Sequence, residues 1–333
     1  MKNVLIIATG GTVASTDSGE GLKPGVSGEN ILSMVPGVTD LCNINVIQPM
    51  NIDSSNMSGK DWLIIAETIL THYDDYDGFV VLHGTDTMAY TAAALSYLIQ
   101  NSTKPIVLTG SQRPIEHPFT DAKLNIYQSI LYAIDDKAFD VSVVFHGKAI
   151  CGTRVKKQRT RSFDAFESMN YPVLANFLEE RIVHSINTST TNSNKLTTYD
   201  KLSSRVAIIK LIPGLSASIF ETFKNTCDVL VLETFGVGGI PEYKNNSFEA
   251  AIDKWIDSGR TIILTTQVPE EGLDLSRYEV GNRYVNIDGI LEAGDMTTEA
   301  IVAKIMYILG RTTSQKEIKE LFYEVVNSDR GEF

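Results

Sequence analysis

Hydroxyl-bearing side chains cluster with glycines directly after three apolar runs of this chain. They occur in TGGT at residues 9–12, in GTDT at residues 84–87 and in TGSQ at residues 109–112. Glycine lets a ligand approach the backbone closely, and a threonine hydroxyl can act as a nucleophile or as a hydrogen-bonding group. Together these residue types indicate a site that binds a ligand and can attack it with a hydroxyl group. A single turn of this kind is more typical of an ordinary strand-to-helix connection, where glycine, threonine and serine are common.

The apolar runs that precede these turns have the lengths of buried strands, and amphipathic segments alternate with them. We predict strands at residues 3–9, 78–83, 105–110 and 141–147, and helices at 58–76 (with Ser58 as N-cap and Asp61 three residues on), 88–101 and 121–136. This alternation predicts a doubly wound parallel sheet. Because ligands bind outside the carboxyl ends of the strands in such sheets, we expect the three polar turns to point toward one crevice.

A change of composition divides the chain. Residues 185–204 are almost all Ser, Thr, Asn and Lys without an apolar period, which indicates a linker. Strand and helix patterns resume beyond it and end in helices at about 298–310 and 314–327. The predicted fold class is therefore α/β, with a larger N-terminal doubly wound, mostly parallel sheet domain (1–184) and a smaller C-terminal α/β domain (205–333).

Composition and charge exclude several classes of protein. The chain has 333 residues, is 43% hydrophobic and has a formal net charge of -12, which disfavours nucleic acid and anionic membrane surfaces as partners. Its apolar runs are too short for a membrane span or a signal-peptide core. The three cysteines, Cys42, Cys151 and Cys227, are far apart and form no CxxC pattern, which argues against a disulfide framework and a zinc site. We expect a soluble cytoplasmic protein.

Other catalytic and cofactor-binding motifs do not occur. The sequence has no P-loop, no HExxH and no GxSxG, and GVGG at residues 236–239 lacks the full dinucleotide-binding spacing. A hydroxyl nucleophile here would need a base other than histidine, and a desolvated lysine can serve. Candidate lysines lie in GTRVKKQRTRSFDAF at residues 152–166. Composition alone favours a solvated basic loop, and the spacing singles out no lysine.

Four segments considered together resemble a known family. They are IIATGGTVAS, YDDYDGFVVLHGTDTMAYTAAALSYLI, PIVLTGSQRP and GTRVKKQRTRSFDAF. They are similar to the L-asparaginases of the threonine-amidohydrolase family, and most of all to the bacterial cytoplasmic type I branch. The resemblance extends over nearly the whole chain, and TGGT with HGTDTM forms a specific pair. It implies hydrolysis of L-asparagine to L-aspartate and ammonia, with no metal and no organic cofactor.

The resemblance also implies roles for particular residues. Thr12 corresponds to the primary nucleophile, Thr85 and Asp86 to the catalytic threonine and aspartate, and Lys157, rather than Lys156, to the catalytic lysine. Lys157 would activate Thr85, and Asp86 would hold the lysine and the substrate's α-amino group. Attack by Thr12 on the side-chain amide would give an acyl-enzyme that water hydrolyses. Backbone N–H groups near Gly11 and Thr85 would bind the oxyanion.

Substrate binding is expected to involve NIDSSNMS at residues 51–58. The resemblance places Asp53 in this loop and Ser54 and Ser55 on the side of the substrate carboxylate. Residues 13–30 would form a mobile lid over the site. The family assembles as homodimers or homotetramers, and the same is expected here.

Three positions depart from the family pattern. Leu22 aligns with a lid tyrosine that orients the nucleophile in many members. Glu233 and Val268 align with an arginine and a cysteine that bind an effector in some type I enzymes, which argues against that regulation.

Two other functions stay open at this point. One is the amidase component of a tRNA-dependent amidotransferase, which shares this core but usually has an extra N-terminal domain, whereas TGGT begins here at residue 9. The other is a catalytically weak protein that binds or senses an amino acid, an alternative that the missing lid tyrosine suggests.

Overall fold

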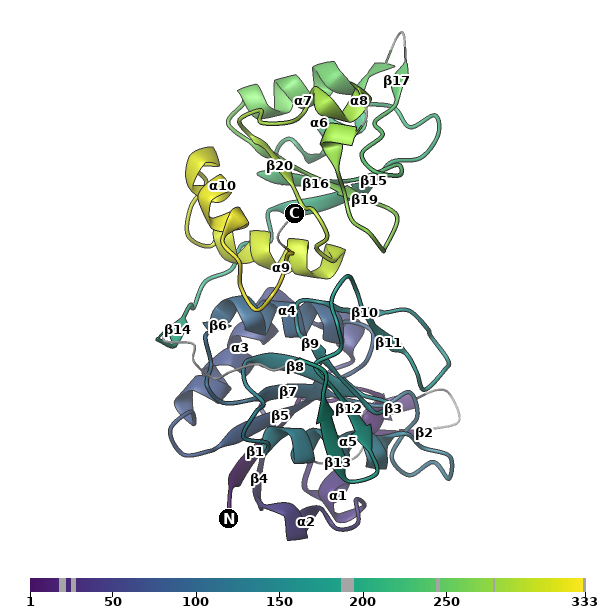
Figure 1. Ribbon diagram of the computed structural model, residues 1–333, viewed down its shortest axis with the longest axis vertical. Coiled ribbons are helices and arrows are strands. Elements are labelled where there is room, and N and C mark those ends of the chain that lie inside the picture. The colour runs from purple at the N-terminus through teal and green to yellow at the C-terminus, as the bar shows by residue number, and fades with distance from the viewer. Residues whose placement is uncertain (18–21, 25–27, 187–194, 244–245, 278, 332–333) are drawn as a thin grey trace. The chain divides into compact units, whose positions relative to one another are not determined.

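The computed structural model describes residues 1–17, 22–24, 28–186, 195–243, 246–277 and 279–331. The chain divides into two compact units, Met1–Asp200 and Lys201–Phe333 (Figure 1). Each unit contains its own sheet and its own helices, and each is described by itself below.

The first unit is built around an eight-stranded sheet with the order β13-β12-β9-β8-β7-β5-β1-β4. Its strands are β1 (Asn3–Ala8), β4 (Asn43–Ile47), β5 (Gly78–Leu82), β7 (Ile106–Thr109), β8 (Val141–Phe145), β9 (Lys148–Cys151), β12 (Ala175–Leu178) and β13 (Arg181–His184). Its helices are α1 (Gly28–Ser33), α2 (Val38–Leu41), α3 (Gly59–Thr71), α4 (Met88–Leu98) and α5 (Ala122–Ala133), with 3₁₀ turns η1 (Thr12–Ala14) and η2 (Ser54–Asn56).

The strand order creates a topological switch point between β1 and β5. Strands β4, β1, β5, β7 and β8 run parallel, and β1 lies between β4 on one side and β5 on the other. The chain thus leaves β1 toward one edge of the sheet and returns on its other side. Ligand crevices of doubly wound sheets lie at such a point, outside the carboxyl ends of the strands.

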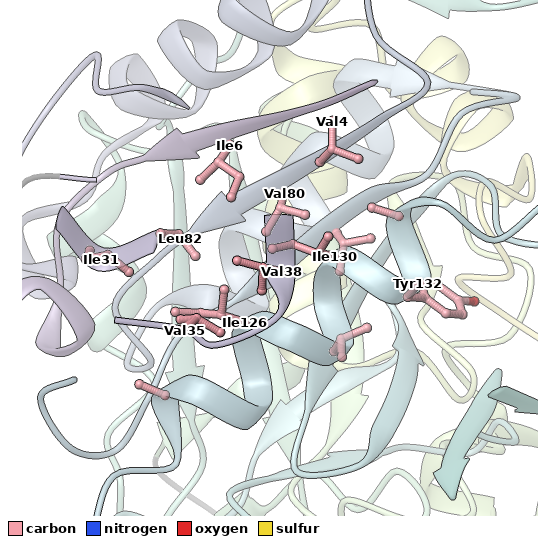
Figure 2. Packing of buried hydrophobic residues seen from close by; sticks show 14 of the residues in the cluster. Val4, Ile6, Ile31, Val35, Val38, Val80, Leu82, Ile126, Ile130 and Tyr132 are labelled. Carbon is pink, nitrogen blue, oxygen red and sulfur yellow. The ribbon is translucent and has the colours of Figure 1, made fainter. Parts of the chain in front are cut away.

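Alternating residues of the central strands build one apolar core. Val4 and Ile6 of β1, with Val80 and Leu82 of β5, pack against the helix face that includes Ile126 (Figure 2). Their neighbours along each strand point to the opposite face of the sheet, and α4, whose side chains are nearly all buried, packs against β7 and β8. A strand buried on both faces is continuously apolar, and this is the pattern that predicted these strands.

The α/β architecture agrees with the sequence prediction, including the N-terminus of α3. Ser58 forms a capping box there, in which its hydroxyl and its backbone nitrogen both lie within hydrogen-bonding distance of the Asp61 carboxylate, at 2.6 Å and 2.8 Å. The antiparallel edge of the sheet, formed by β9, β12 and β13, was not predicted. Each of these strands has only four residues, which is too short for a clear alternation of apolar and polar side chains.

Short strand pairs complete the first unit. They are β2 (Ser15–Asp17) with β3 (Leu22–Pro24), β10 (Val155–Lys157) with β11 (Phe166–Ser168), and β6 (Ile99–Gln100) with β14 (Thr197–Thr198). The last pair contains residues from the segment 185–204, of which residues 187–194 lie outside the described part of the chain. The domain boundaries proposed from the sequence remain a prediction.

The second unit contains a four-stranded parallel sheet with the order β15-β16-β19-β20. Its elements are β15 (Val206–Lys210), α6 (Ile219–Phe223), β16 (Val229–Thr234), β17 (Glu242–Tyr243), β18 (Asn246–Ser247), α7 (Phe248–Asp257), β19 (Thr261–Thr266), η3 (Leu275–Arg277), α8 (Glu279–Asn282), β20 (Ile290–Glu292), α9 (Thr298–Leu309) and α10 (Gln315–Tyr323). Phe220, Phe248 and Trp255 from α6 and α7 pack on one face of this sheet. Among the described residues, no helix is both long and apolar enough to cross a bilayer.

A fully buried ion pair attaches the C-terminal segment to α9. Lys304 donates hydrogen bonds to Asp329 at 2.6 Å and to the Glu324 carbonyl at 2.5 Å, and both members of the pair are 0% exposed. Burial lowers the pKa of Lys304, and Asp329 opposes that shift. Because a buried charge without its partner is costly, this pair fixes the segment after α10 to the helix.

We expect Asp329→Ala to destabilise the second unit strongly, by about 3–5 kcal/mol, since it leaves the Lys304 ammonium buried without a counter-charge. Glu221→Gln is the matched control, because it removes the partner of Lys254 from a pair whose side chains are 65% and 52% exposed. Its effect should be small. Urea unfolding of the purified chain measures both. Equal effects of the two substitutions would contradict the assignment.

Candidate active site

Two glycine turns are in direct backbone contact at the switch point. Gly11, with φ +83°, lies against Gly84 so closely that a Cβ on Gly11 would come within 2.5 Å of the Gly84 Cα and N atoms. No residue with a side chain can make this contact without displacing one of the turns. Thr12 directly follows Gly11 and Thr85 directly follows Gly84, so the contact brings the backbones of the two threonines close together.

The loop at residues 51–58 joins the same contact. Gly10 forms a parallel bridge with Ile52, whose carbonyl accepts a hydrogen bond from the Gly11 nitrogen at 3.2 Å. Ser54 packs against Gly84, where a Cβ would come within 2.6 Å of the serine hydroxyl, and its carbonyl accepts from the Thr87 hydroxyl at 2.8 Å. Three segments far apart in the sequence are thereby held at the carboxyl ends of β1 and β5.

Hydrogen bonds separate the structural hydroxyls from the reactive candidates. The hydroxyls of Thr9, Thr87, Thr109 and Ser111 each donate to a backbone carbonyl, of Leu82, Ser54, Val144 and Arg113 respectively. These four side chains therefore stabilise the turns. The Thr85 hydroxyl instead contacts two side chains, Lys157 and Gln112.

Lys157 is the residue whose amine contacts Thr85. Its Nζ lies 2.7 Å from the Thr85 hydroxyl and 2.6 Å from Asp86 Oδ1. The lysine side chain is 15% exposed and the Asp86 side chain is 68% exposed, so the ion pair lies at the mouth of the site. This geometry unites Thr85, Asp86 and Lys157 as the resemblance implied, while their catalytic roles remain predictions.

A short hairpin, rather than a solvated loop, positions this lysine. Lys157 ends β10 and is paired with Phe166 of β11, whose buried ring contacts Phe145 at a centroid distance of 5.0 Å. Glu167 of β11 accepts from Arg159 at 2.7 Å. Register, a buried ring and an ion pair together fix the direction in which the lysine extends.

Gln112 also contacts Thr85, a contact that the sequence did not predict although TGSQ was one of the polar turns. Its Oε1 lies 3.3 Å from the Thr85 hydroxyl, and its Nε2 donates to the carbonyls of Ser162 and Arg159 at 3.1 Å and 3.4 Å. Its backbone nitrogen donates to the Asp121 carboxylate at 2.9 Å. Desolvation by burial raises the pKa of Asp121. The signal that could have revealed Gln112 is its place at the end of the third strand.

Beneath the turns, His83 is fully buried and fixes the peptide before Thr85. Its Nδ1 lies 2.7 Å from the Gly84 carbonyl, its Nε2 lies 2.9 Å from the Thr91 hydroxyl, and Trp62 donates to that hydroxyl at 2.9 Å. Because a carbonyl only accepts, the proton is on Nδ1 and Thr91 donates to Nε2. Desolvation lowers the pKa of His83 to about 4, so the ring is neutral. His83 thus has a supporting position, which the sequence did not predict.

Three of the predicted substrate-binding residues, Asp53, Ser54 and Ser55, lie in the loop at residues 51–58. Asp53 Oδ1 accepts from the Ser55 hydroxyl at 2.6 Å and from its backbone nitrogen at 2.8 Å, and these hydrogen bonds lower the pKa of Asp53. Ser54 is buried, whereas Ser55 is exposed. Their substrate-binding roles remain predictions.

Parts of the expected lid lie outside the described residues. Residues 18–21 and 25–27 are not described, and of Leu22 only its backbone pairing with Asp17 is. In the second unit, Glu233 accepts a hydrogen bond from Thr298 at 3.0 Å, and Val268 is 49% exposed. In the described parts of the chain no three His, Cys, Asp or Glu side chains converge as metal ligands would.

Comparison with known proteins gives matches over nearly the whole chain. Residues 3–191 match the family model "Asparaginase, N-terminal", and residues 205–322 match "Glutaminase/Asparaginase C-terminal domain". An L-asparaginase of Thermococcus kodakarensis is 37% identical over 96% of both chains, and L-asparaginase 1 of Escherichia coli is 33% identical over 96% of this chain and 95% of its own. One of the subunits of the glutamyl-tRNA(Gln) amidotransferase of Pyrococcus furiosus is 32% identical, over 96% of this chain and 75% of its own.

Solved structures of L-asparaginases also match this chain over nearly its whole length. The thermostable L-asparaginase from T. kodakarensis superposes with a TM-score of 0.91 at 34% identity, covering 99% of this chain and 100% of its own. L-asparaginase I from Vibrio cholerae superposes with a TM-score of 0.87 at 28% identity, covering 99% of each chain. The probable cytoplasmic L-asparaginase from Campylobacter jejuni superposes with a TM-score of 0.83 at 25% identity, covering 98% of this chain and 100% of its own.

The contact between the two glycine turns predicts a specific loss of stability. Gly11→Ala adds a clash with Gly84 to the cost of a positive φ, whereas Gly147→Ala adds only that cost, since φ is +78° there and nothing lies within 4 Å. The positive φ alone costs about 1–2 kcal/mol, a few degrees in melting temperature. We expect Gly11→Ala to lower that temperature at least about twice as far. Equal losses in calorimetry would show that the contact is not tight.

The hydrogen bonds of His83 predict its tautomer. At neutral pH its ring should be neutral with the proton on Nδ1, and it should not titrate in the folded chain until the pH falls toward about 4. The ¹⁵N chemical shifts of the ring measure both properties, and the chain unfolded in denaturant should show the ordinary midpoint of about 6.5. A proton on Nε2, or a folded-state midpoint near the ordinary one, would overturn the network.

Proposed function

Because this chain belongs to the asparaginase family, we propose that it is an amidohydrolase that converts L-asparagine to L-aspartate and ammonia, with Thr12 as nucleophile. The observation that supports this most directly is the contact of the Lys157 amine with both Thr85 and Asp86, at 2.7 Å and 2.6 Å. These groups lie beside the backbone contact that Thr12 follows. In this proposal the site combines two hydroxyls, a carboxylate and an amine, as an amidase without a histidine base requires.

The proposed reaction begins with attack of the Thr12 hydroxyl oxygen on the side-chain amide carbon. Lys157 accepts a proton through Thr85, and backbone N–H groups near Gly11 and Thr85 bind the oxyanion that forms. The C–N bond then breaks, and ammonia leaves with a proton returned by the same path. Water, activated through Thr85, attacks the resulting ester, so that aspartate is released and the Thr12 hydroxyl is restored.

The proposed substrate orientation uses charges at the rim of the site. Asp86 binds the α-ammonium group of asparagine, and its 68% exposed side chain leaves room for that contact. Asp53, whose pKa is lowered by hydrogen bonds from Ser55, is a second acceptor in the loop beside it. Ser54 and Ser55 face the substrate carboxylate in this proposal.

We further propose a cytoplasmic homodimer or homotetramer. The relative from C. jejuni, which is described as probably cytoplasmic, supports the compartment, and the family resemblance supports the assembly. The relatives that belong to glutamyl-tRNA(Gln) amidotransferases support a second candidate, an amidase that releases ammonia for a partner enzyme. Ammonia release by the purified chain without tRNA or a second protein separates the two. Tight asparagine binding without ammonia release would instead indicate a binding or sensing protein.

We expect the purified chain to release ammonia from L-asparagine, and Thr12→Ala and Lys157→Met each to lower kcat by about a thousandfold or more, since each removes a group that takes part in the reaction. Lys156→Met is the matched control on the same strand and should keep most of the activity. A coupled ammonia assay measures all four proteins. Full activity of Thr12→Ala, or loss in Lys156→Met with activity kept in Lys157→Met, would contradict the assignment.

A further inference from the structure

We propose that Gln112 is a positioning residue that directs the proton of the Thr85 hydroxyl away from Lys157 in the resting site. The proposal deepens the function proposed above and rests on it for its catalytic consequence. Its structural part, the direction of the hydrogen bonds, rests on the contacts of Gln112 alone.

The orientation of the Gln112 amide is determined by its neighbours. Its Nε2 faces the carbonyls of Ser162 and Arg159, at 3.1 Å and 3.4 Å, and carbonyls only accept hydrogen bonds. A flipped amide would place its oxygen against two other oxygens. Oε1 therefore faces Thr85, and because it is only an acceptor, the hydroxyl must donate to it.

This direction determines the bond between Thr85 and Lys157. A hydroxyl has one proton, so while Thr85 donates to Gln112 it can only accept from the lysine amine 2.7 Å away. The amine also donates to Asp86 at 2.6 Å, as a charged lysine does. In the resting site Lys157 therefore donates a hydrogen bond to Thr85, and Thr85 donates one to Gln112. In this arrangement Thr85 has no proton to give to the lysine.

The bond to Gln112 is the weaker of the two. At 3.3 Å it exceeds the usual length of a hydrogen bond between two oxygens, so the proton can turn toward Lys157 once that amine is neutral. Gln112 itself stays in place, because its backbone nitrogen is bound to Asp121 and its amide to the loop after β10. Gln112 thus favours the charged lysine, and its loss favours the neutral amine that accepts a proton from Thr85.

The charged side chains on the turns, loops and strands that form the site and the β10–β11 hairpin stay the same when Gln112 is replaced. They are Asp86 on the GTDT turn, Asp53 on the loop at 51–58, Asp121 before α5, Lys148 on β9, Lys156 on β10, Glu167 on β11, and Arg159, Arg161 and Asp164 between β10 and β11. A change in the behaviour of the lysine can therefore be assigned to the lost acceptor.

The first test uses the complete chain without substrate. Acetic anhydride acylates neutral amines, and mass spectrometry measures labelling of Lys157 against Lys156 in the same peptide. We expect Gln112→Met to raise the labelling of Lys157 relative to Lys156 by about threefold, the effect of one weak hydrogen bond. Gln158→Met is the matched control, since it removes a glutamine beside Lys157 whose amide contacts Met169. Its ratio should equal that of the unchanged chain.

The second test measures kcat/KM for asparagine against pH. In Gln112→Met the fall of activity at acidic pH should move to lower pH by about half a unit, with little change in KM, and Gln158→Met should leave the profile in place. A purely structural role would lower activity at every pH without moving the profile. Gln112→Leu, which also lacks the acceptor, should agree with Gln112→Met, and circular dichroism verifies that both variants fold.

An unchanged or lower labelling ratio in both folded variants would overturn the proposal. If the unchanged chain releases no ammonia while the ratio rises as expected, the proposed function fails and the direction of the hydrogen bonds stands. If the chain is active and the ratio does not rise, the function stands and the role of Gln112 fails.

Discussion

The site depends on the contact between two backbones that have no side chains at the point where they meet. Gly11 and Gly84 lie in the turns after β1 and β5, and a single Cβ on Gly11 would overlap the Gly84 backbone at 2.5 Å. Parallel neighbouring strands bring the turns to the same edge, but only glycine lets them touch. The spacing between Thr12 and Thr85 is therefore set by main-chain atoms, which lose no side-chain entropy and cannot change rotamer.

Around this contact the hydroxyl groups divide into two kinds. Those of Thr9 and Thr109 satisfy carbonyls on neighbouring strands and so keep the turns in register. Thr85 differs because its partners are side chains from other segments, and one of them, the Lys157 amine, can exchange a proton with it. Beneath it, the neutral ring of His83 donates to the Gly84 carbonyl and keeps the peptide before Thr85 from rotating. The hydrogen-bonded turns and His83 thus hold the backbone in place, while the hydroxyl proton of Thr85 can change its partner.

The sequence predicted the parts of the structure that have a strong local pattern. The runs that became β1, β5 and β7, the polar turns after them and the N-cap Ser58 are all visible within a few residues. The hairpin of Lys157 was not visible, because β10 has only three residues and two of them are lysines. Gln112 and His83 were missed for another reason, since their roles follow from contacts across the fold and glutamine or histidine at a strand end has many structural uses.

The exposure of Asp86 indicates what the ion pair with Lys157 contributes. With 68% of the Asp86 side chain in solvent, the pair adds little to stability, and what it contributes is the position of the amine, 2.6 Å from the carboxylate. Under the proposed function, the α-ammonium group of asparagine binds the same carboxylate and places a second positive charge near the lysine, which favours the neutral amine. Under this proposal the substrate itself helps to create the base that its hydrolysis requires, and the proton of Thr85 turns from Gln112 to Lys157 once the site is filled.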